Sequence, residues 1–250
     1  MINTNFSTNK YTHFFSIYKI SIKSKSVIIF QNKENLELFV DKGIIDRRQA
    51  RLIFGSGVNT DTYFYSEELM TDNPIVLFPS RLLKEKGVET FVEVSKILKA
   101  RVNVRMYIAG KLDSENPSSI SKSQIDNWVE HGLVEWGGHI EDMPTLLSQS
   151  SIICLPTYYP EGIPKALIEA ASSGRAIITT DMPGCNEIVQ NNDNGILISI
   201  KSSDQLARAI IKLINDAPLR NKYGKNGRKL VLEKFSSEIV DNATLEVYAD

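Results

Sequence analysis

The sequence is poor in residues that build covalent or metal-held frameworks. Its 250 residues include two cysteines and three scattered histidines, so neither a disulfide scaffold nor a Cys/His metal cluster is expected. No apolar run approaches the ~20 residues that a membrane-spanning helix needs. Basic and acidic residues nearly cancel, to a net charge of −1, which gives no reason to expect nucleic acid as a partner. We therefore predict no metal and no cofactor, and interpret Cys154 and Cys185 as free thiols.

Acidic residues are also absent from the first 33 positions, which carry five lysines among apolar residues. Such a segment suits an anionic membrane surface. A lysine run is more often the solvated face of a half-buried element, and the sequence favours that second interpretation. No small-residue cleavage site follows, so no secretory signal is predicted. The expected location is the cytoplasm, with peripheral contact at the inner face of the cytoplasmic membrane as a further option.

From residue 75 onward, short apolar strands alternate with helical segments. Near-continuous hydrophobic runs predict strands buried on both faces, and apolar residues at i, i+3, i+4 and i+7 predict helices. This alternation predicts an α/β fold, a parallel sheet covered by helices. The predicted strands are residues 75–80, 104–110, 152–157, 176–180 and 195–199. The predicted helices are residues 88–100, 143–150, 164–173, 203–216 and 219–235.

The first 70 residues predict a second, smaller unit. Residues 26–31 are typical of a strand, and residues 33–43 of a helix that ends at Gly43. Residues 51–57 predict a further strand that runs into a Gly-Ser-Gly turn. The polar tract 66–73 is predicted to be a linker.

Charged residues gather where the predicted strands end. "EGIPKALIEA" (residues 161–170) places Glu161 just before a predicted helix and Glu169 inside it. "PSRLLKEKG" (residues 79–87) leaves the first strand of the larger unit with an arginine and two lysines. Open α/β sheets bind ligands at the carboxyl ends of their strands, so we expect these residues to share a site.

This combination suits a ligand that joins a sugar, a diphosphate and a ribose. Free N–H groups at the helix start favour a phosphate, and Arg81 and Lys86 complement its charge. Carboxylates only accept hydrogen bonds, so Glu161 and Glu169 suit two pairs of hydroxyl donors. Each residue taken alone is more commonly a solvated surface charge. Their shared place at strand ends favours the functional interpretation.

Longer motifs resemble a known family. "EGIPKALIEAASSGRAIITTDMPGCNEIV" (161–189) is similar to the signature of the retaining GT-B glycosyltransferases with a Glu-x7-Glu motif, which build bacterial lipopolysaccharide, capsule and lipid-linked oligosaccharides. Further motifs stand in that family's order: "IFGSGVNTDTYF" (53–64), "LFPSRLLKEKGVETFVEV" (77–94), "YIAG" (107–110), "VEWGGHIEDMPTLL" (134–147) and "NNDNGILI" (191–198). The resemblance covers roughly residues 25–250, and it implies a GT-B type fold with Rossmann-like domains.

The resemblance implies roles for particular residues. Arg81 and Lys86 resemble the pair that holds the donor diphosphate, and Glu161 resembles the acceptor for donor-sugar hydroxyls. These three form the implied catalytic group, while Glu169 resembles the acceptor for the ribose diol. The other implied donor-binding residues are Gly110 beside the nucleotide, His139 and Ile140 at the uracil ring, and Gly162 and Ile163, whose N–H groups would meet the phosphates.

The implied activity is transfer of a hexose or N-acetylhexosamine from a UDP-sugar, with retention, to a lipid-linked or polysaccharide acceptor. Enzymes that act on undecaprenyl-diphosphate-linked acceptors are the most similar members. The sequence contains no Asp-x-Asp motif, so a metal-bridged diphosphate is not expected.

The family's amino-terminal acceptor-binding domain normally precedes the strand predicted at 26–31, and about 25 residues precede that strand here. The implied organisation is a remnant of the acceptor-side domain with a linker (1–70), a donor-binding domain (71–234) and a helix returning toward the amino-terminal domain (235–250). Three hypotheses follow. The chain is an active donor half, working with a separate acceptor-domain chain if one exists; or a truncated, catalytically inactive nucleotide-sugar-binding module; or an enzyme of the UDP-N-acetylglucosamine 2-epimerase type, whose own motifs are not found.

Overall fold

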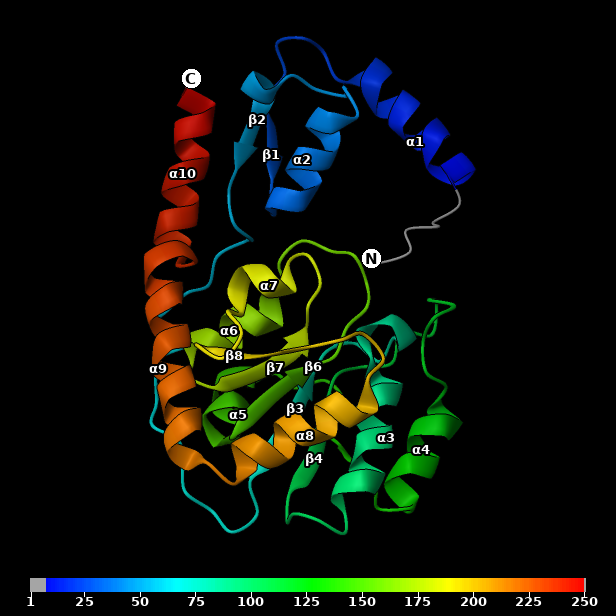
Figure 1. Cartoon of the computed structure of the whole chain (residues 1–250), viewed down its shortest axis with the longest axis vertical. Helices are drawn as coiled ribbons and strands as arrows, with labels where there is room; N and C mark the ends of the chain where they lie inside the picture. Colours follow the sequence, from blue (N-terminus) through cyan, green and yellow to red (C-terminus); the bar gives the residue numbers. More distant parts are fainter. Residues whose placement is uncertain (1–7, 250) are drawn as a thin grey trace.

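The computed structural model describes residues 8–249, and it describes side chains from residue 15 onward. The part of the basic amino-terminal prediction that falls on residues 1–7 lies outside the described residues. A small amino-terminal unit stands at one end of a larger α/β unit (Figure 1). Helices α9 (Ala217–Lys234) and α10 (Ser237–Ala249) follow one another along the side of both units.

A six-stranded parallel sheet forms the centre of the larger unit, in the order β5-β4-β3-β6-β7-β8. The five predicted strands are confirmed. The two-residue β5 escaped prediction because it offers no apolar run. The strands are β3 (Ile75–Pro79), β4 (Arg105–Ala109), β5 (Glu135–Trp136), β6 (Ile152–Leu155), β7 (Ala176–Thr180) and β8 (Gly195–Ile198).

Helices cover the sheet on both faces. The chain moves toward one edge of the sheet from β3 to β4, and toward the opposite edge from β6 to β7. Because parallel crossovers are right-handed, the helices that connect these two pairs of strands lie on opposite faces of the sheet. Helices α3 and α8 pack together, and so do α6 and α9. The five predicted helices are confirmed to within two residues at each end. Besides α9, the helices of the larger unit are α3 (Val88–Leu98), α4 (Lys122–Glu130), α5 (Met143–Gln149), α6 (Lys165–Ser172), α7 (Cys185–Ile188) and α8 (Ser203–Ile214).

The core lies between the sheet and these helices. Every residue of β3, β6 and β7 is buried, as predicted for strands covered on both faces. Helices α4 and α7 were not predicted. The first has one fully buried residue, Ile125, and the second has only four residues, so neither shows a clear helical period.

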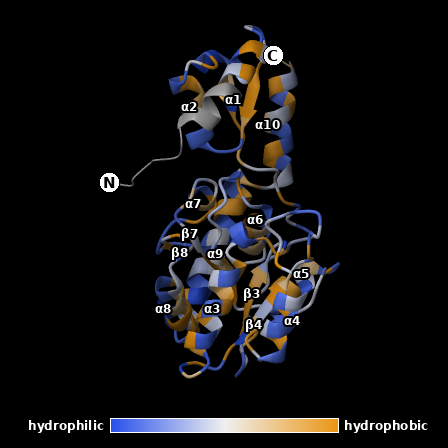
Figure 2. Ribbon diagram, turned by 90° about the vertical axis from the view of Figure 1, so that its right-hand side faces the viewer, coloured by the Kyte–Doolittle hydropathy of each residue, from blue (hydrophilic) through white to orange (hydrophobic). Residues whose placement is uncertain are grey.

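The amino-terminal unit has a small core of its own. Strands β1 (Ile28–Phe30) and β2 (Ala50–Leu52) pair in parallel, and α2 (Lys33–Asp41) connects them, which confirms both predicted strands and the predicted helix. Their apolar residues form a cluster separate from the larger core, which Figure 2 shows as a second orange centre. Helix α1 (Thr8–Ser21) joins this cluster through Phe15, while residues 16–21 are exposed.

The start of the predicted linker is fixed to the larger unit by two buried arginines. Arg175 donates to Ser66 Oγ at 2.9 Å, and Arg220 pairs with Glu68 at 2.9 Å with both side chains buried. Arg220 also donates to the Ile214 carbonyl at 2.9 Å. A buried pair of this kind resists separation, because removing one partner leaves an uncompensated charge. The domain boundary at residue 70 stays a prediction.

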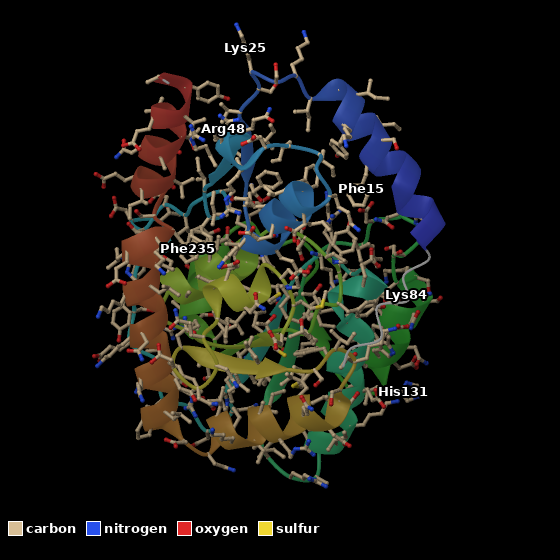
Figure 3. The ribbon with its side chains drawn as sticks, turned by 45° about the horizontal axis from the view of Figure 1, so that its top comes forward. Phe15, Lys25, Arg48, Lys84, His131 and Phe235 are labelled. Atoms are coloured by element: carbon tan, nitrogen blue, oxygen red, sulfur yellow. The ribbon has the colours of Figure 1, made fainter. Side chains whose placement is uncertain are left out.

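The last predicted segment, residues 235–250, contains the helix α10. Where it begins, the Val58 N–H donates to the Phe235 carbonyl at 2.9 Å, and Figure 3 shows Phe235 at the level where the two units meet. Part of the apolar side of α10 is exposed: Ile239, Leu245 and Tyr248 face solvent. None of the helices in the described part of the chain has the length and apolar content needed to cross a membrane.

Candidate functional site

The sheet changes direction between β3 and β6. From β3 the chain builds outward through β4 to β5, and from β6 it builds through β7 to β8. Ligands of open α/β sheets bind outside the carboxyl ends of the strands at such a point. The loops that leave β3 (80–87) and β6 (156–164) therefore define the candidate site. Figure 1 shows α6 and α7 at the end of the larger unit that faces the amino-terminal unit.

These two loops bring Lys86 and Glu161 into an ion pair, in which Lys86 Nζ donates to Glu161 Oε1. The side chains are 12% and 24% exposed. Lys86 Nζ also lies 5.5 Å from the centre of the Tyr159 ring. A largely buried ion pair is held more firmly than one in open water, because the loss of either partner leaves the other without its counter-charge. The pair therefore fixes one loop against the other.

Backbone contacts between the loops set the position of the lysine. Lys86 is the last residue of the short 3-10 helix η2 (Lys84–Lys86), and Gly87 follows it as the C-cap residue. Gly87 has φ +82°, a left-handed conformation that favours glycine. A Cβ at Gly87 would also collide with the Pro156 carbonyl. The Tyr158 N–H donates to the Glu85 carbonyl at 2.9 Å. The two loops thus approach closely along their backbones.

The start of α6 is open. Pro164, predicted as the first residue of this helix, is its N-cap residue, and no side chain caps the helix. The first N–H groups of a helix have no partner inside it and carry the positive end of the helix dipole. Gly162 and the buried Ile163 precede this start. The arrangement favours an anion at the α6 start.

Glu169 lies one turn inside α6. Its side chain is 14% exposed, and Lys165 Nζ lies 3.9 Å from its carboxylate. Burial raises the pKa of Glu169, while a hydrogen bond from Tyr63 and the charge of Lys165 lower it. The pKa of Tyr63 is raised in turn, by burial and by the charge of Glu169. Glu169 is thus an acceptor kept partly out of water.

Arg81 and Gly110 lie on neighbouring loops of the same sheet edge. Arg81 is half exposed and pairs with Asp113 of the loop after β4 at 2.8 Å. The Gly110 N–H donates to the Gly138 carbonyl at 2.7 Å, and a Cβ at Gly110 would collide with the Ser80 carbonyl. Close packing of three loops is therefore a sufficient reason for glycine at position 110.

The loop after β5 carries the last two predicted residues. His139 is exposed and Ile140 is half-buried. Trp136 Nε1 donates to the Gly110 carbonyl at 2.9 Å and ties this loop to its neighbour. All nine predicted site residues therefore lie at or just beyond the carboxyl edge of the sheet. Within the described part of the chain, Lys86 and Glu161 are the two predicted residues that form a side-chain ion pair with each other.

Some residues at the site were missed by sequence reasoning. Asp113 sits in a polar loop without a recognisable pattern, and Tyr159 is one of two adjacent tyrosines, so neither gave a signal. Cys154 and Cys185 are free, as predicted. Burial raises the pKa of Cys185 to about 11, so its thiol is protonated at neutral pH and is a poor nucleophile. The described residues include no cluster of metal-ligating side chains.

A family model described as glycosyl transferases group 1 matches residues 59–230 of the sequence. The chain belongs to this family. The match contains β3 to β8 and both loops of the candidate site, so the Lys86–Glu161 pair and the α6 start lie within the residues matched by the group 1 model.

Two named relatives are similar to this group 1 member. The N,N'-diacetylbacillosaminyl-diphospho-undecaprenol alpha-1,3-N-acetylgalactosaminyltransferase of Campylobacter jejuni is 31% identical over 245 residues, which cover 93% of this chain and 62% of that protein. The capsular polysaccharide biosynthesis glycosyltransferase CapM of Staphylococcus aureus is 32% identical over 174 residues, which cover 69% of this chain and 45% of that protein. The chain thus spans about half to three fifths of their length.

Solved structures share the fold. A glycosyltransferase from Rickettsia africae matches with a TM-score of 0.81 at 22% identity, over 94% of this chain and 66% of that one. HepE from Anabaena, in complex with UDP and glucose, matches with a TM-score of 0.79 at 17% identity, over 98% of this chain and 68% of that one. The α/β architecture of this group 1 member therefore matches known glycosyltransferase structures.

The raised pKa of Glu169 predicts a stability that depends on pH. Because the folded chain favours the protonated carboxyl, this group's contribution to folding is present at low pH and is lost as pH rises through the folded pKa. Glu169→Gln removes the charge and keeps the shape, so it should stabilise the chain at pH 7 by roughly 1 kcal/mol, the usual size of a single stabilising change. Urea unfolding from pH 3.5 to 8 should show the gain shrink as pH falls.

Glu233→Gln is the matched control. Glu233 has the same i,i+4 lysine at 3.9 Å, but it is exposed on α9, so its replacement should change stability little at any pH. Loss of stability in Glu169→Gln at pH 7 would contradict the account of Glu169 as a desolvated charge.

Proposed function

We propose that the chain binds a UDP-sugar and transfers its hexose or N-acetylhexosamine, with retention, to a lipid-linked or other glycan acceptor in cell-surface glycan synthesis. The observation that carries the proposal is the Lys86–Glu161 pair at the switch point of the sheet, beside the open start of α6. A cation and free N–H groups there suit a diphosphate, and a carboxylate next to them suits sugar hydroxyls.

Each predicted residue has a place in this proposal. The diphosphate lies at the α6 start, between Lys86 and Arg81, where the N–H groups of Gly162 and Ile163 meet it. Glu161 accepts from donor-sugar hydroxyls and Glu169 from the ribose diol. The backbone around His139 and Ile140 reads the uracil ring, and the absence of a side chain at Gly110 keeps the adjoining loop close to the nucleotide. No metal takes part.

The proposed reaction breaks the bond between the anomeric carbon and the diphosphate oxygen. The acceptor hydroxyl forms its new bond on the face from which the diphosphate leaves, and its proton passes to the departing diphosphate. Negative charge therefore grows on the leaving group. Lys86, Arg81 and the helix start stabilise that charge, and preorganised donors of this kind act most strongly where water is excluded.

The comparisons support this choice of ligands. HepE, whose fold matches, was solved with UDP and glucose. The Campylobacter relative is named for transfer of N-acetylgalactosamine to a diphospho-undecaprenol-linked sugar. An undecaprenyl-diphosphate-linked glycan is therefore the acceptor that we propose to test first.

The proposed site predicts which lysine matters for UDP. Lys86→Ala should weaken UDP binding about tenfold or more, because a charge-assisted hydrogen bond contributes about 1.5–3 kcal/mol. Lys84→Ala is the matched control: it removes the same charge from the same short helix, but Lys84 is exposed (Figure 3). Calorimetric titrations with UDP, GDP and ADP measure both effects, and thermal unfolding confirms that the variants are folded. Equal losses in the two variants would contradict a specific role for Lys86.

Transfer itself is a separate prediction. With UDP-sugars and an undecaprenyl-diphosphate-linked acceptor, the chain should form a glycosidic product that keeps the anomeric configuration, as read by NMR. The reaction is run with and without a separately expressed acceptor domain from a relative. UDP binding without product in either reaction would instead identify a catalytically inactive nucleotide-sugar-binding module.

We further propose that α1 and the turn after it contact an anionic membrane surface. Ile17 and Ile20 are 63% and 85% exposed, and Lys19, Lys23 and Lys25 surround them without an acidic residue in residues 8–33. Figure 3 shows Lys25 projecting from the end of the amino-terminal unit. Exposed apolar residues among lysines suit the boundary between anionic headgroups and acyl chains.

Vesicle flotation tests this location. The chain should float with vesicles that contain phosphatidylglycerol and stay behind with neutral vesicles, and Ile20→Glu should reduce flotation severalfold. Ile200→Glu is the matched control, since Ile200 is an exposed isoleucine of the larger unit. Equal flotation of the two variants, or none by the unaltered chain, would refute the proposal.

A further inference from the structure

One buried amide of the amino-terminal unit reaches the loop before α6. Asn32 is 1% exposed, and its Nδ2 donates to the Glu161 carbonyl at 3.2 Å, across 129 residues of sequence. Its Oδ1 accepts from the Asn35 N–H at 2.8 Å and so caps α2. Both ends of the amide are therefore engaged, one inside its own unit and one on the loop before α6.

Other contacts at this junction hold the same loop from two sides. A Cβ at Gly162 would collide with the side chain of Gln31, and a Cβ at Gly184 would collide with the Gly162 carbonyl. The Lys33 N–H donates to Glu187 Oε1 of α7 at 3.2 Å. The segment from Glu161 to Gly162 thus lies between the start of α2 and the start of α7.

The geometry of the peptide gives the Asn32 contact a consequence for the site. The Glu161 carbonyl and the Gly162 N–H belong to one planar trans peptide, so they point in opposite directions. A donor that holds the carbonyl therefore fixes the direction of the N–H. Glycine is free to adopt many backbone conformations, so without this contact the peptide could turn at little cost.

We infer that Asn32 is a positioning residue for the donor site, which aims the Gly162 N–H at the diphosphate by holding the Glu161 carbonyl. The same contact keeps Glu161 where its carboxylate meets Lys86. The inference rests on the proposed function and adds a residue of the amino-terminal unit to it. UDP affinity then depends on a contact that the nucleotide itself does not make.

Two substitutions separate positioning from capping. Asn32→Ser and Asn32→Asp both keep an oxygen that caps α2, and both remove the amide donor. Asn32→Ser should weaken UDP binding about fivefold, the effect of one hydrogen bond, and Asn32→Asp should weaken it more because it adds a negative charge. Amide exchange in the UDP-bound chain should become faster at Gly162 in both variants.

Asn103→Ser is the matched control. Asn103 Nδ2 donates to the Asp72 carbonyl at 2.9 Å, a contact of the same kind outside the candidate site. Its loss should leave UDP affinity and Gly162 exchange unchanged.

The outcomes distinguish the inference from the proposed function. If the unaltered chain binds UDP and Asn32→Ser binds it equally well, the positioning role is wrong while the UDP site stands. Weakening in Asn32→Asp alone would also overturn it, since charge would then be the cause. Unfolding of Asn32→Ser but not of Asn103→Ser would assign Asn32 a purely structural role. Failure of the unaltered chain to bind UDP would overturn the proposed function, and the inference with it.

Discussion

The ion pair between Lys86 and Glu161 is the contact on which the arrangement of the site depends. It joins the loop after β3 to the loop after β6, the two neighbouring strands from which the chain builds in opposite directions. The open start of α6 and the carboxylate of Glu169 follow the second of these loops directly. The sheet order thus brings together residues that lie 75 positions apart in the sequence.

Groups that are costly to keep in a folded protein are concentrated at this edge. The Lys86 side chain is largely buried beside its partner, the start of α6 has no side-chain cap, and Glu169 has a raised pKa because it is buried. Elsewhere polar groups are satisfied: in the described part of the chain, Ser173 Oγ is the one buried side-chain atom without a partner. A site that binds an anionic ligand is expected to contain such unfavourable groups, since the bound ligand supplies the interactions that they lack.

The sequence predicted most of the fold, because β3, β6 and β7 are continuous apolar runs and the main helices have clear periods. It missed α1, β5, α4 and α7, which are short or weakly patterned. The predicted site residues lie at one sheet edge, as the switch-point rule implies. Individual contacts between side chains could not be predicted from the sequence. Nothing near Asn32 in the sequence indicates Glu161, and the loop packing that requires Gly110 appears only when three strands are placed side by side.

Amide chemical-shift mapping with UDP tests the central claim most directly. In a uniformly 15N-labelled chain, saturating UDP should shift the N–H signals of Gly162, Ile163 and Lys165 most strongly, because these groups precede or open α6 and have no side-chain cap. Signals at the opposite sheet edge, such as Arg105, should move little. Largest shifts away from the α6 start, or none at saturating UDP, would contradict a diphosphate site built around Lys86 and Glu161.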